Sequence, residues 1–341
     1  MRRRLPAEWE KQDGVLLAWP HARTDWRDTL DKVQPVFGQI AAAISRFEQV
    51  LIVSPEPETV RQQLAQTSAD MERVRLFQID TNDTWIRDFG PITVQLGNTP
   101  VLFDFGFNGW GLKFAADLDN QVTQKLARLG AFGNREVRIP GLILEGGSIE
   151  SNGAGTLLTT KKCLLSPNRN PHLDQQGIER ALCALIGCRR ILWLQHGALE
   201  GDDTDSHIDT LVRFGPEHTL LYVRCDDPED SHFAELAALE NELRELRTAA
   251  GRPYRLIPLP WPSPCLAADG HRLPAGYANF LIINNAVLVP TYRDKQDQNA
   301  LAAIAQAFPG REIIGIDCLP LIAQHGSLHC VTMHLPQGVL P

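Results

Sequence analysis

Long hydrophobic runs are absent from this 341-residue chain, although 43% of its residues are hydrophobic. Its longest apolar stretches, such as residues 15–19 and 281–283, are far shorter than the roughly 20 residues that a membrane-spanning helix needs. Residues 1–14 are basic but lead into further charged residues, so they do not resemble a signal peptide. We therefore expect a globular cytoplasmic protein that has no membrane partner.

Basic residues and paired cysteine motifs are also scarce. The chain has 33 Lys and Arg against 41 Asp and Glu, which gives a net charge of −8 and argues against general nucleic-acid binding. Its seven cysteines are scattered and form no CxxC motif, which excludes zinc-ribbon and thioredoxin-like sites. Since a chain of this size needs no disulfide scaffold, we expect a reducing compartment. The acidic balance weakly favours cationic small molecules as ligands.

Short β-branched segments alternate with amphipathic helical segments along the whole chain, a pattern typical of an α/β fold. In one segment Val36, Ile40, Ile44 and Phe47 recur at the spacing of a single buried helical face. Similar patterns predict helices at residues 35–47, 58–66, 118–129, 174–186, 231–249 and 296–308.

Four β-hairpins are also predicted, because turn residues separate pairs of short apolar segments. Their strand pairs are residues 92–96 and 101–105, 156–159 and 163–165, 208–214 and 219–223, and 280–283 and 287–289. The segments that start at Leu157 and Leu281 align without gaps as strand, turn, strand, loop and arginine. Their separation corresponds to two periods of about 62 residues.

This periodicity predicts about five hairpin-plus-helix units, arranged around an axis within a single domain that spans residues 1–341. The last unit would close when an N-terminal strand near residues 15–19 pairs with a C-terminal strand near residues 330–334. The alternative is an ordinary two-layer α/β fold in which the spacing is accidental.

Four segments concentrate side chains that can carry chemistry. They are residues 83–91, 144–147, 201–209 and 326–332. The first mixes acids, Arg87 and Trp85; the second sets Glu145 beside two glycines; the third surrounds His207 with four acids; the fourth contains Cys330. Each also has a purely structural interpretation: an ion-paired loop, a β-bulge with an exposed glutamate, a polar strand end and a small buried cysteine.

The acidic segment lacks the glycine and glutamate positions of a calcium loop. His207 and Asp209 would share one face of a strand, so a His–carboxylate metal site is a second interpretation, although no second histidine lies at ligand spacing. Asp88 and His207 each precede a predicted turn by nine residues, which would place both at the same end of equivalent units. With Cys330 they would form a nucleophile, a base and an anion at one site.

Taken together, the order and spacing of these segments resemble the agmatine deiminase family, which includes the Porphyromonas-type peptidylarginine deiminases and belongs to the guanidino-modifying (pentein) superfamily. The resemblance covers residues 5–336, and its most specific pieces are DTWIRDFGP, FNGWG, LEGGSIE, TLLTTKKCLLSPNRNP, GDDTDSHID and LHC. It implies a five-bladed pseudo-symmetric α/β-propeller, a small cationic guanidino substrate, and no cofactor or metal. A homo-oligomer is compatible with the sequence.

The resemblance also implies roles for individual residues. Cys330 would be the nucleophile, His207 the general acid and base, and Glu145 the carboxylate partner of His207. Asp88 and Asp209 would grip the guanidinium. The implied reaction hydrolyses agmatine to N-carbamoylputrescine and ammonia through a thiouronium intermediate, a step of polyamine and putrescine biosynthesis. Three acids near the thiol lead us to expect that the pKa of Cys330 is raised when no substrate is bound.

For an amine-tailed substrate, Trp85 and Trp110 are candidates to contact the methylene chain, and Asp203 is a candidate counter-charge, although both tryptophans could simply be packed in the core. Two departures from the family pattern concern substrate fit. Residues 324–328 read QHGSL where the family has several glycines, and Ser206 replaces a family glycine. The alternatives are a deiminase of peptidyl-arginine or another guanidino compound, a metal-dependent hydrolase, and an inactive binding module.

Overall fold

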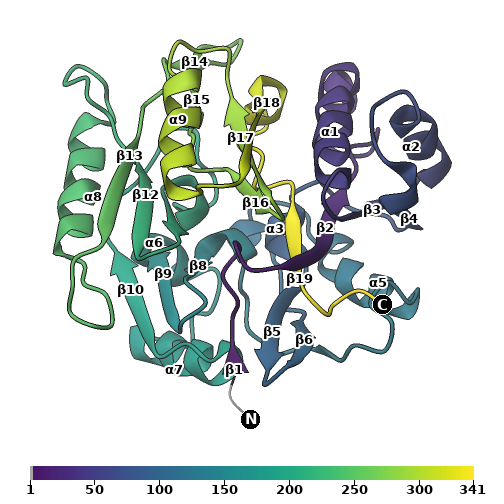
Figure 1. The fold of residues 1–341 in the computed structure, drawn as a ribbon, viewed down its shortest axis with the longest axis horizontal. Helices are drawn as coiled ribbons and strands as arrows, with labels where there is room; N and C mark the ends of the chain where they lie inside the picture. Colours follow the sequence, from purple (N-terminus) through teal and green to yellow (C-terminus); the bar gives the residue numbers. More distant parts are fainter. Residues whose placement is uncertain (1–2) are drawn as a thin grey trace.

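The computed structural model describes residues 3–341 and shows a mixed α/β fold built from several small sheets (Figure 1). The strands are β1 (Arg3–Arg4), β2 (Gln12–Ala18), β3 (Gln49–Ser54), β4 (Val74–Gln78), β5 (Ile92–Leu96), β6 (Thr99–Phe103), β7 (Val137–Arg138), β8 (Ile149–Ser151), β9 (Thr156–Thr160), β10 (Arg190–Leu194), β11 (Val212–Gly215), β12 (Thr219–Val223), β13 (Arg255–Leu259), β14 (Cys265–Leu266), β15 (Arg272–Leu273), β16 (Leu281–Ile283), β17 (Ala286–Thr291), β18 (Glu312–Asp317) and β19 (Met333–Pro336). The helices are α1 (Leu30–Ser45), α2 (Pro57–Leu64), α3 (Ile86–Phe89), α4 (Gly109–Leu112), α5 (Val122–Arg128), α6 (Lys161–Leu164), α7 (Gln175–Ile186), α8 (Phe233–Glu245), α9 (Asp297–Ala307) and α10 (Leu319–Ile322).

Five of the six sheets in the described chain share one arrangement. An antiparallel strand pair is followed by a connection that contains a helix, and the chain then returns as a parallel strand. In one of them β16 pairs antiparallel with β17, α9 follows, and β18 returns parallel to β17. The others are β11-β12-β13 with α8, β8-β9-β10 with α7, β5-β6-β7 with α5, and β19-β2-β3 with α1. A helical connection is what a parallel pair requires.

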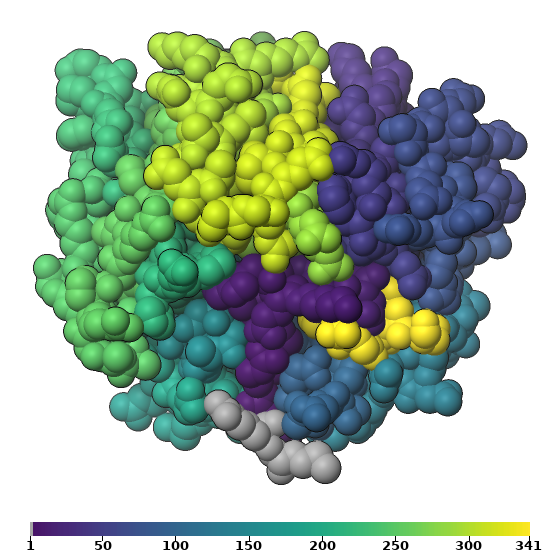
Figure 2. Space-filling model, in the orientation of Figure 1, coloured from purple at the N-terminus to yellow at the C-terminus, as the bar shows by residue number. Residues whose placement is uncertain are grey.

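The two ends of the chain are joined to distant parts of it. β19 pairs antiparallel with β2, with Met333 opposite Leu16, so the C-terminal strand completes the sheet that the N-terminal strand begins. β1 pairs instead with β5 of the next sheet. Figure 2 shows the N-terminal segment crossing the middle of one face, in contact with segments of widely different sequence position. The predicted pairing of the two ends is confirmed.

The six predicted helices are present, with ends that differ from the prediction by up to five residues. α7 shows why such segments form: the side chain of Asp174 accepts a hydrogen bond from the Gly177 N–H at 2.7 Å, and Gly187 ends the helix in the left-handed conformation with φ 75°. Its apolar face buries Ile178 and Leu182. This burial against the sheet supplies most of the stability of such short helices.

Two predicted hairpins, around residues 97 and 284, form as expected. The hairpin predicted from residues 156–159 and 163–165 is wrong. β9 is the second strand of a hairpin with β8, and the chain then enters α6, because the hydroxyl of Thr160 accepts a hydrogen bond from the Cys163 N–H and caps that helix. The gapless alignment of the segments starting at Leu157 and Leu281 is therefore displaced by one strand.

The strand predicted for residues 208–214 is also shorter than expected. Residues Ile208–Thr210 form a 3-10 turn, η5, and β11 begins only at Val212. Buried strands such as β2 and β3 are continuous apolar runs, as expected for strands covered on both faces. Within the described residues, every helix is too short or too polar to cross a bilayer.

Candidate active site

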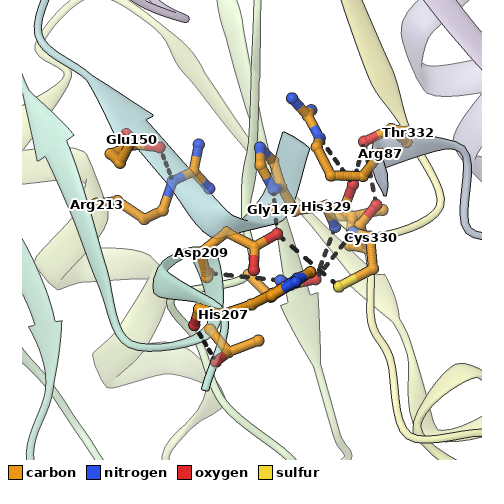
Figure 3. Close-up of polar contacts among 12 residues, drawn as sticks. Arg87, Gly147, Glu150, His207, Asp209, Arg213, His329, Cys330 and Thr332 are labelled. Atoms are coloured by element: carbon orange, nitrogen blue, oxygen red, sulfur yellow. Dashed lines mark hydrogen bonds and ion pairs between the residues drawn. The ribbon is translucent and has the colours of Figure 1, made fainter. Parts of the chain in front are cut away.

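The four segments singled out in the sequence each lead into the first strand of a sheet. Asp88 lies on α3 before β5, and η4 (Gly146–Ser148) precedes β8. η5 follows His207 and carries Asp209 before β11, and Cys330 lies three residues before β19. Since equivalent positions in similar sheets lie at the same end, the fold brings these side chains together. Figure 3 shows His207, Asp209 and Cys330 grouped in one cluster.

The thiol of Cys330 is nearly buried, with 6% of the residue exposed, and lies beside an acid. Its Sγ is 3.9 Å from Oδ2 of Asp209. Its backbone is fixed on both sides, because its N–H donates to Oδ1 of Asn279 at 3.2 Å and its carbonyl accepts from the Arg87 N–H at 3.2 Å. Burial, followed by the charges of Asp209 and Asp88, raises the pKa of the Cys330 thiol well above its usual value.

The imidazole of His207 lies between two carboxylates. Its Nε2 is 3.5 Å from Oε2 of Glu145, and its Nδ1 is 3.6 Å from Oδ1 of Asp88. Neither ring nitrogen has a hydrogen-bond partner among the described residues. Burial by itself lowers the pKa of His207, but Asp88, Cys163 and Glu145 outweigh it, so that the pKa is raised well above its usual value. The imidazole is therefore poised to be a proton donor.

Arg169 holds Glu145 in place. Its Nε lies 2.8 and 2.9 Å from the two oxygens of Glu145, and its NH1 reaches Oδ2 of Asp205 at 2.6 Å. Burial raises the pKa of Glu145, but the hydrogen bonds and charges of His207 and Arg169 outweigh this effect and bring the pKa below its usual value. Glu145 is thus a carboxylate that faces His207.

One group of side chains has the donor types of a zinc site. Atoms of Glu145, Cys163 and His207 lie within 4.8 Å of one another. The guanidinium of Arg169 occupies the same carboxylate, however, and a cation there opposes the binding of a metal ion. The geometry favours His207 acting with Glu145 in proton transfer over a metal site.

Asp88 and Asp209 differ in how many of their carboxylate oxygens accept hydrogen bonds. Asp88 accepts hydrogen bonds from Trp110 Nε1 and from the Gly147 N–H, both at 2.9 Å, and burial is the main reason that its pKa is raised to about 6. Asp209 accepts from His329 through Oδ2, while its buried Oδ1 has no partner among the described residues. Burial raises the pKa of Asp209, but the hydrogen bond and charge of His329 bring it below the usual value.

Gly147 lies where three of these groups meet. A Cβ atom at this position would be 2.6 Å from Nδ1 of His207 and 2.9 Å from Oδ1 of Asp88. It would also be 3.1 Å from Oδ2 of Asp209. Any side chain at this position would therefore displace the cluster.

A cavity of about 360 Å³ opens above Cys330 and Asp88. Trp85, Trp110 and Asp203 all line it, so the structure places the three predicted substrate contacts around one space. The mouth is acidic; its remaining charged or titratable wall residues are Asp25, Asp83, Asp202 and His325.

Three residues of the altered loop before Cys330 line the cavity: Gln324, His325 and Gly326. His325 lines the cavity, has φ 69°, and its Nδ1 is 2.8 Å from the carbonyl oxygen of Gly201. Ser327 instead lies within hydrogen-bond distance of the Tyr292 hydroxyl, at 3.0 Å, away from the cavity wall. Ser206 has φ 66°, which accounts for the glycine that the family has at this position.

Several residues of the cluster escaped the sequence reasoning. Arg169 lies within the SPNRNP motif and His329 within LHC, so both lay in motifs that were already recognised. Glu8 and Asn279 carried no local signal, because their importance depends on partners that are far away in sequence. Glu8 approaches His329, 321 residues further along the chain.

Comparisons with known proteins agree with this geometry. The family model described as Porphyromonas-type peptidyl-arginine deiminase matches residues 4–336. The agmatine deiminase of Pseudomonas aeruginosa is 33% identical over 98% of this chain and 95% of its own length.

Two solved structures are similar throughout. The C. jejuni agmatine deiminase, in a cysteine-to-serine variant with substrate bound, is 38% identical with a TM-score of 0.92, covering 99% of this chain and 97% of its own. A Porphyromonas gingivalis structure provisionally named as an arginine deiminase is 49% identical with a TM-score of 0.95, covering 100% of both chains.

Proposed function

Because this chain belongs to the Porphyromonas-type peptidyl-arginine deiminase family, we propose that it is an agmatine deiminase that hydrolyses agmatine to N-carbamoylputrescine and ammonia. One observation carries the proposal. Cys330 lines an acidic cavity, and its thiol adjoins the buried Asp209, whose Oδ1 has no partner among the described residues. A planar cation with several N–H donors, such as a guanidinium, suits these acceptors.

Binding orients the guanidinium and assists ionisation of the thiol. Asp209 offers Oδ1, and Asp88 supplies a second carboxylate across the cluster. Charge-assisted hydrogen bonds of this kind contribute roughly 1.5–3 kcal/mol each. The arriving cation offsets the repulsion that Asp88 and Asp209 exert on a thiolate, so Cys330 ionises more readily in the complex than in the free enzyme.

The first half of the reaction forms a bond from Cys330 Sγ to the central guanidinium carbon. The tetrahedral adduct collapses when His207, as imidazolium, donates a proton to the leaving nitrogen, and ammonia departs. An S-alkylthiouronium remains on the cysteine. Glu145 stabilises the imidazolium from Nε2 and fixes the ring.

The second half replaces sulfur by oxygen. Neutral His207 takes a proton from a water molecule, and the hydroxyl attacks the thiouronium carbon. The C–S bond of this adduct breaks to release the thiolate, and the hydroxyl proton is lost to solvent, which leaves the neutral ureido product. The reaction involves no change of oxidation state, and Cys330 itself carries the amidino group in the intermediate, so this chemistry requires no cofactor. The catalytic thiol must stay reduced, which favours a cytoplasmic location.

The acidic mouth supports agmatine over arginine as the substrate. Asp203 can face the ammonium of agmatine, and Trp85 and Trp110 can line its methylene chain. The α-carboxylate of free arginine would meet Asp203, Asp83 and Asp25 in the same region. Burial raises the pKa of Asp83 to about 7, so its charge is partial at neutral pH and grows above it.

The test is a direct comparison of substrates. Ureido product is measured from agmatine, free arginine and an arginyl peptide, with wild-type protein and with Cys330→Ser. We expect product from agmatine in preference to the other two, no turnover by the variant, and a transient adduct mapped to Cys330 by mass spectrometry. Preference for the peptide would make the chain a peptidyl-arginine deiminase, and activity that resists thiol alkylation but not chelators would indicate a metal-dependent hydrolase.

We also propose that the fold is a five-bladed propeller within a single catalytic domain. The support is the shared arrangement of five sheets and the meeting of the segments that lead into four of them at one site. Each antiparallel pair forms one unit together with the parallel strand that follows it. The pairing of β19 with β2 joins the C-terminal strand to the N-terminal unit.

A further inference from the structure

His329, the residue before the nucleophile, lies between two carboxylates. Its Nδ1 is 2.7 Å from Oδ2 of Asp209, and its Nε2 is 2.7 Å from Oε2 of Glu8. The ring is buried, with 2% of the side chain exposed. Each nitrogen thus has an acceptor as its partner, and both must carry a proton if both are to donate.

Both carboxylates favour the ionised form and therefore act as acceptors. The pKa of Glu8 is raised by burial but lowered more strongly by His329, Arg213 and Arg87, and lies well below its usual value. Asp209 shows the same balance, with His329 as the largest lowering influence. The imidazole thus bridges two buried carboxylates at hydrogen-bond distance.

We propose that His329 is a positioning residue for the hydrolysis of the guanidino group: by bridging Glu8 and Asp209 it fixes the plane of Asp209 and keeps one oxygen of that carboxylate free for the substrate. Oδ2 of Asp209 is bound to His329 and adjoins Sγ of Cys330 at 3.9 Å, and Oδ1 is the unpartnered atom. This inference rests on the proposed guanidine chemistry, because it assigns the role of Asp209 toward a guanidinium.

The hydrogen bond to Asp209 also acts on the nucleophile. Asp209 is the charge that most opposes ionisation of Cys330. An imidazole N–H that donates to Asp209 weakens this opposition, since its dipole partly cancels the field of the carboxylate at the sulfur. Removing His329 should therefore make the thiolate harder to form as well as misplace Asp209.

Glu8 is the anchor of this bridge. Its Oε1 accepts a hydrogen bond from the Ile282 N–H at 2.8 Å and lies 3.0 Å from NH2 of Arg213. Other charged or titratable groups that face the bridge are Arg87, Arg213, Glu150, His334 and Cys330. Of these, His334 contacts Glu8 and Arg87 but not Asp209, which makes it a matched control.

The experiment compares His329→Gln, Glu8→Gln and His334→Gln in the full-length protein. For each we measure kcat and KM for agmatine, the pH dependence of kcat/KM, and the rate of Cys330 alkylation by iodoacetamide against pH. For His329→Gln we expect kcat/KM to fall by about a hundredfold, with a raised KM, because the carboxylate is misplaced. The alkylation profile should move to higher pH.

Glu8→Gln should give a smaller change in the same direction, because the amide oxygen of glutamine is a weaker acceptor for the His329 N–H than the carboxylate that it replaces. His334→Gln should keep wild-type values. The proposal would be overturned if folded His329→Gln kept the wild-type KM and alkylation profile. It would also be overturned if the variant lost activity only in proportion to its loss of folded protein, as measured by circular dichroism.

A binding measurement covers the case in which the single variants fold poorly. In the Cys330→Ser background, calorimetric titration with agmatine should show weaker binding once His329→Gln is added, and equal affinity would contradict the inference. If the wild type turns over no guanidine at all, the proposed function fails, whereas the alkylation comparison still measures the effect of His329 on the thiol.

Discussion

Buried charge governs this site at the scale of single residues. Asp88, Glu145, His207 and Asp209 have side chains that are at most 3% exposed, and Cys330 adjoins them. In such surroundings each carboxylate changes the proton affinity of its neighbours, and burial opposes every charge that is not paired. The site therefore holds a thiol that resists ionisation beside an imidazole that retains its proton. A bound cationic substrate would favour ionisation of the thiol.

Cys330, the proposed nucleophile, gives the first prediction. Because burial and the neighbouring aspartates raise the pKa of Cys330, the thiolate fraction of the free enzyme is small at neutral pH and rises about tenfold per pH unit below that pKa. Alkylation of Cys330 by iodoacetamide should accelerate with pH through and beyond pH 8, followed by mass spectrometry of the labelled peptide. An alkylation midpoint well below pH 7 would refute the assignment.

Asp88 gives the second prediction. Its pKa is raised to about 6, so it loses its charge at a higher pH than an ordinary aspartate as the solution is acidified. The KM for agmatine should rise as the pH falls below about 6, and Asp88→Asn should raise KM by about tenfold to a hundredfold at pH 8, equivalent to one charged hydrogen bond.

The control for Asp88→Asn is Asp80→Asn, which affects only an exposed ion pair with Arg23. It should leave KM unchanged. Equal KM values at pH 5 and pH 8 in the wild type would show that Asp88 does not bind the guanidinium.

At the scale of elements, the site depends on short helical turns that precede strands. α3, η4 and η5 each have only three or four residues, and each directs one or two side chains inward before the chain enters a sheet. Ion pairs also connect loops near the cavity. Lys113 binds Oδ1 of Asp205 at 2.8 Å, and that aspartate binds Arg169. Small displacements of a turn would thus be felt by the whole cluster.

Gly147 of η4 tests this dependence. Its backbone φ is not in the left-handed region, so Gly147→Ala adds no backbone strain, but the new methyl group would overlap Nδ1 of His207 and Oδ1 of Asp88. We expect kcat to fall by about a hundredfold or more, the loss associated with a displacement of about 1 Å, in a protein that still folds.

Gly276→Ala is the matched control, since the nearest atoms to a Cβ there are 3.8 Å away. Activity and melting temperature should both stay at wild-type values in this control. Wild-type activity in Gly147→Ala would mean that the cluster moves freely, contrary to the packing described above.

At the scale of the whole molecule, the N-terminal segment holds the centre together. Glu8 lies between the buried guanidiniums of Arg87 and Arg213, at 3.5 and 3.0 Å, and contacts His329. Arg213 is fully buried and has Glu150 as its other acid. Several segments distant in sequence therefore share one buried ion network, whose members tolerate the interior only while they are paired.

Deletion of residues 1–10 tests the importance of this segment. The loss of Glu8 leaves Arg87 and Arg213 short of an anion, which we expect to lower the free energy of unfolding by about 3–5 kcal/mol in urea titrations. Deletion of residues 1–4 alone removes β1 and retains Glu8, and should cost less. Equal stability of the two truncated proteins would show that Glu8 contributes little.

Local patterns in the sequence determined the helices and the hairpins around residues 97 and 284, because each depends on apolar spacing and turn residues that lie close together. The pairing of the two chain ends followed instead from the repeat period, which required a last unit to close. Motif resemblance proposed site roles for Cys330, His207, Glu145, Asp88 and Asp209. The error at residues 156–165 arose where a Thr160 cap decided between a strand and a helix, two outcomes that the same short apolar pattern permits.

Only the tertiary structure decided how these side chains are held. The bridge from Asp209 through His329 to Glu8, and the clamp of Arg169 on Glu145, join residues that are up to 321 positions apart. No local pattern encodes such contacts, because their energies come from desolvation and Coulomb interactions that exist only after the chain has buried them. For the same reason the raised pKa of Cys330 could be anticipated from nearby acids, whereas the free oxygen of Asp209 could be seen only in the folded protein.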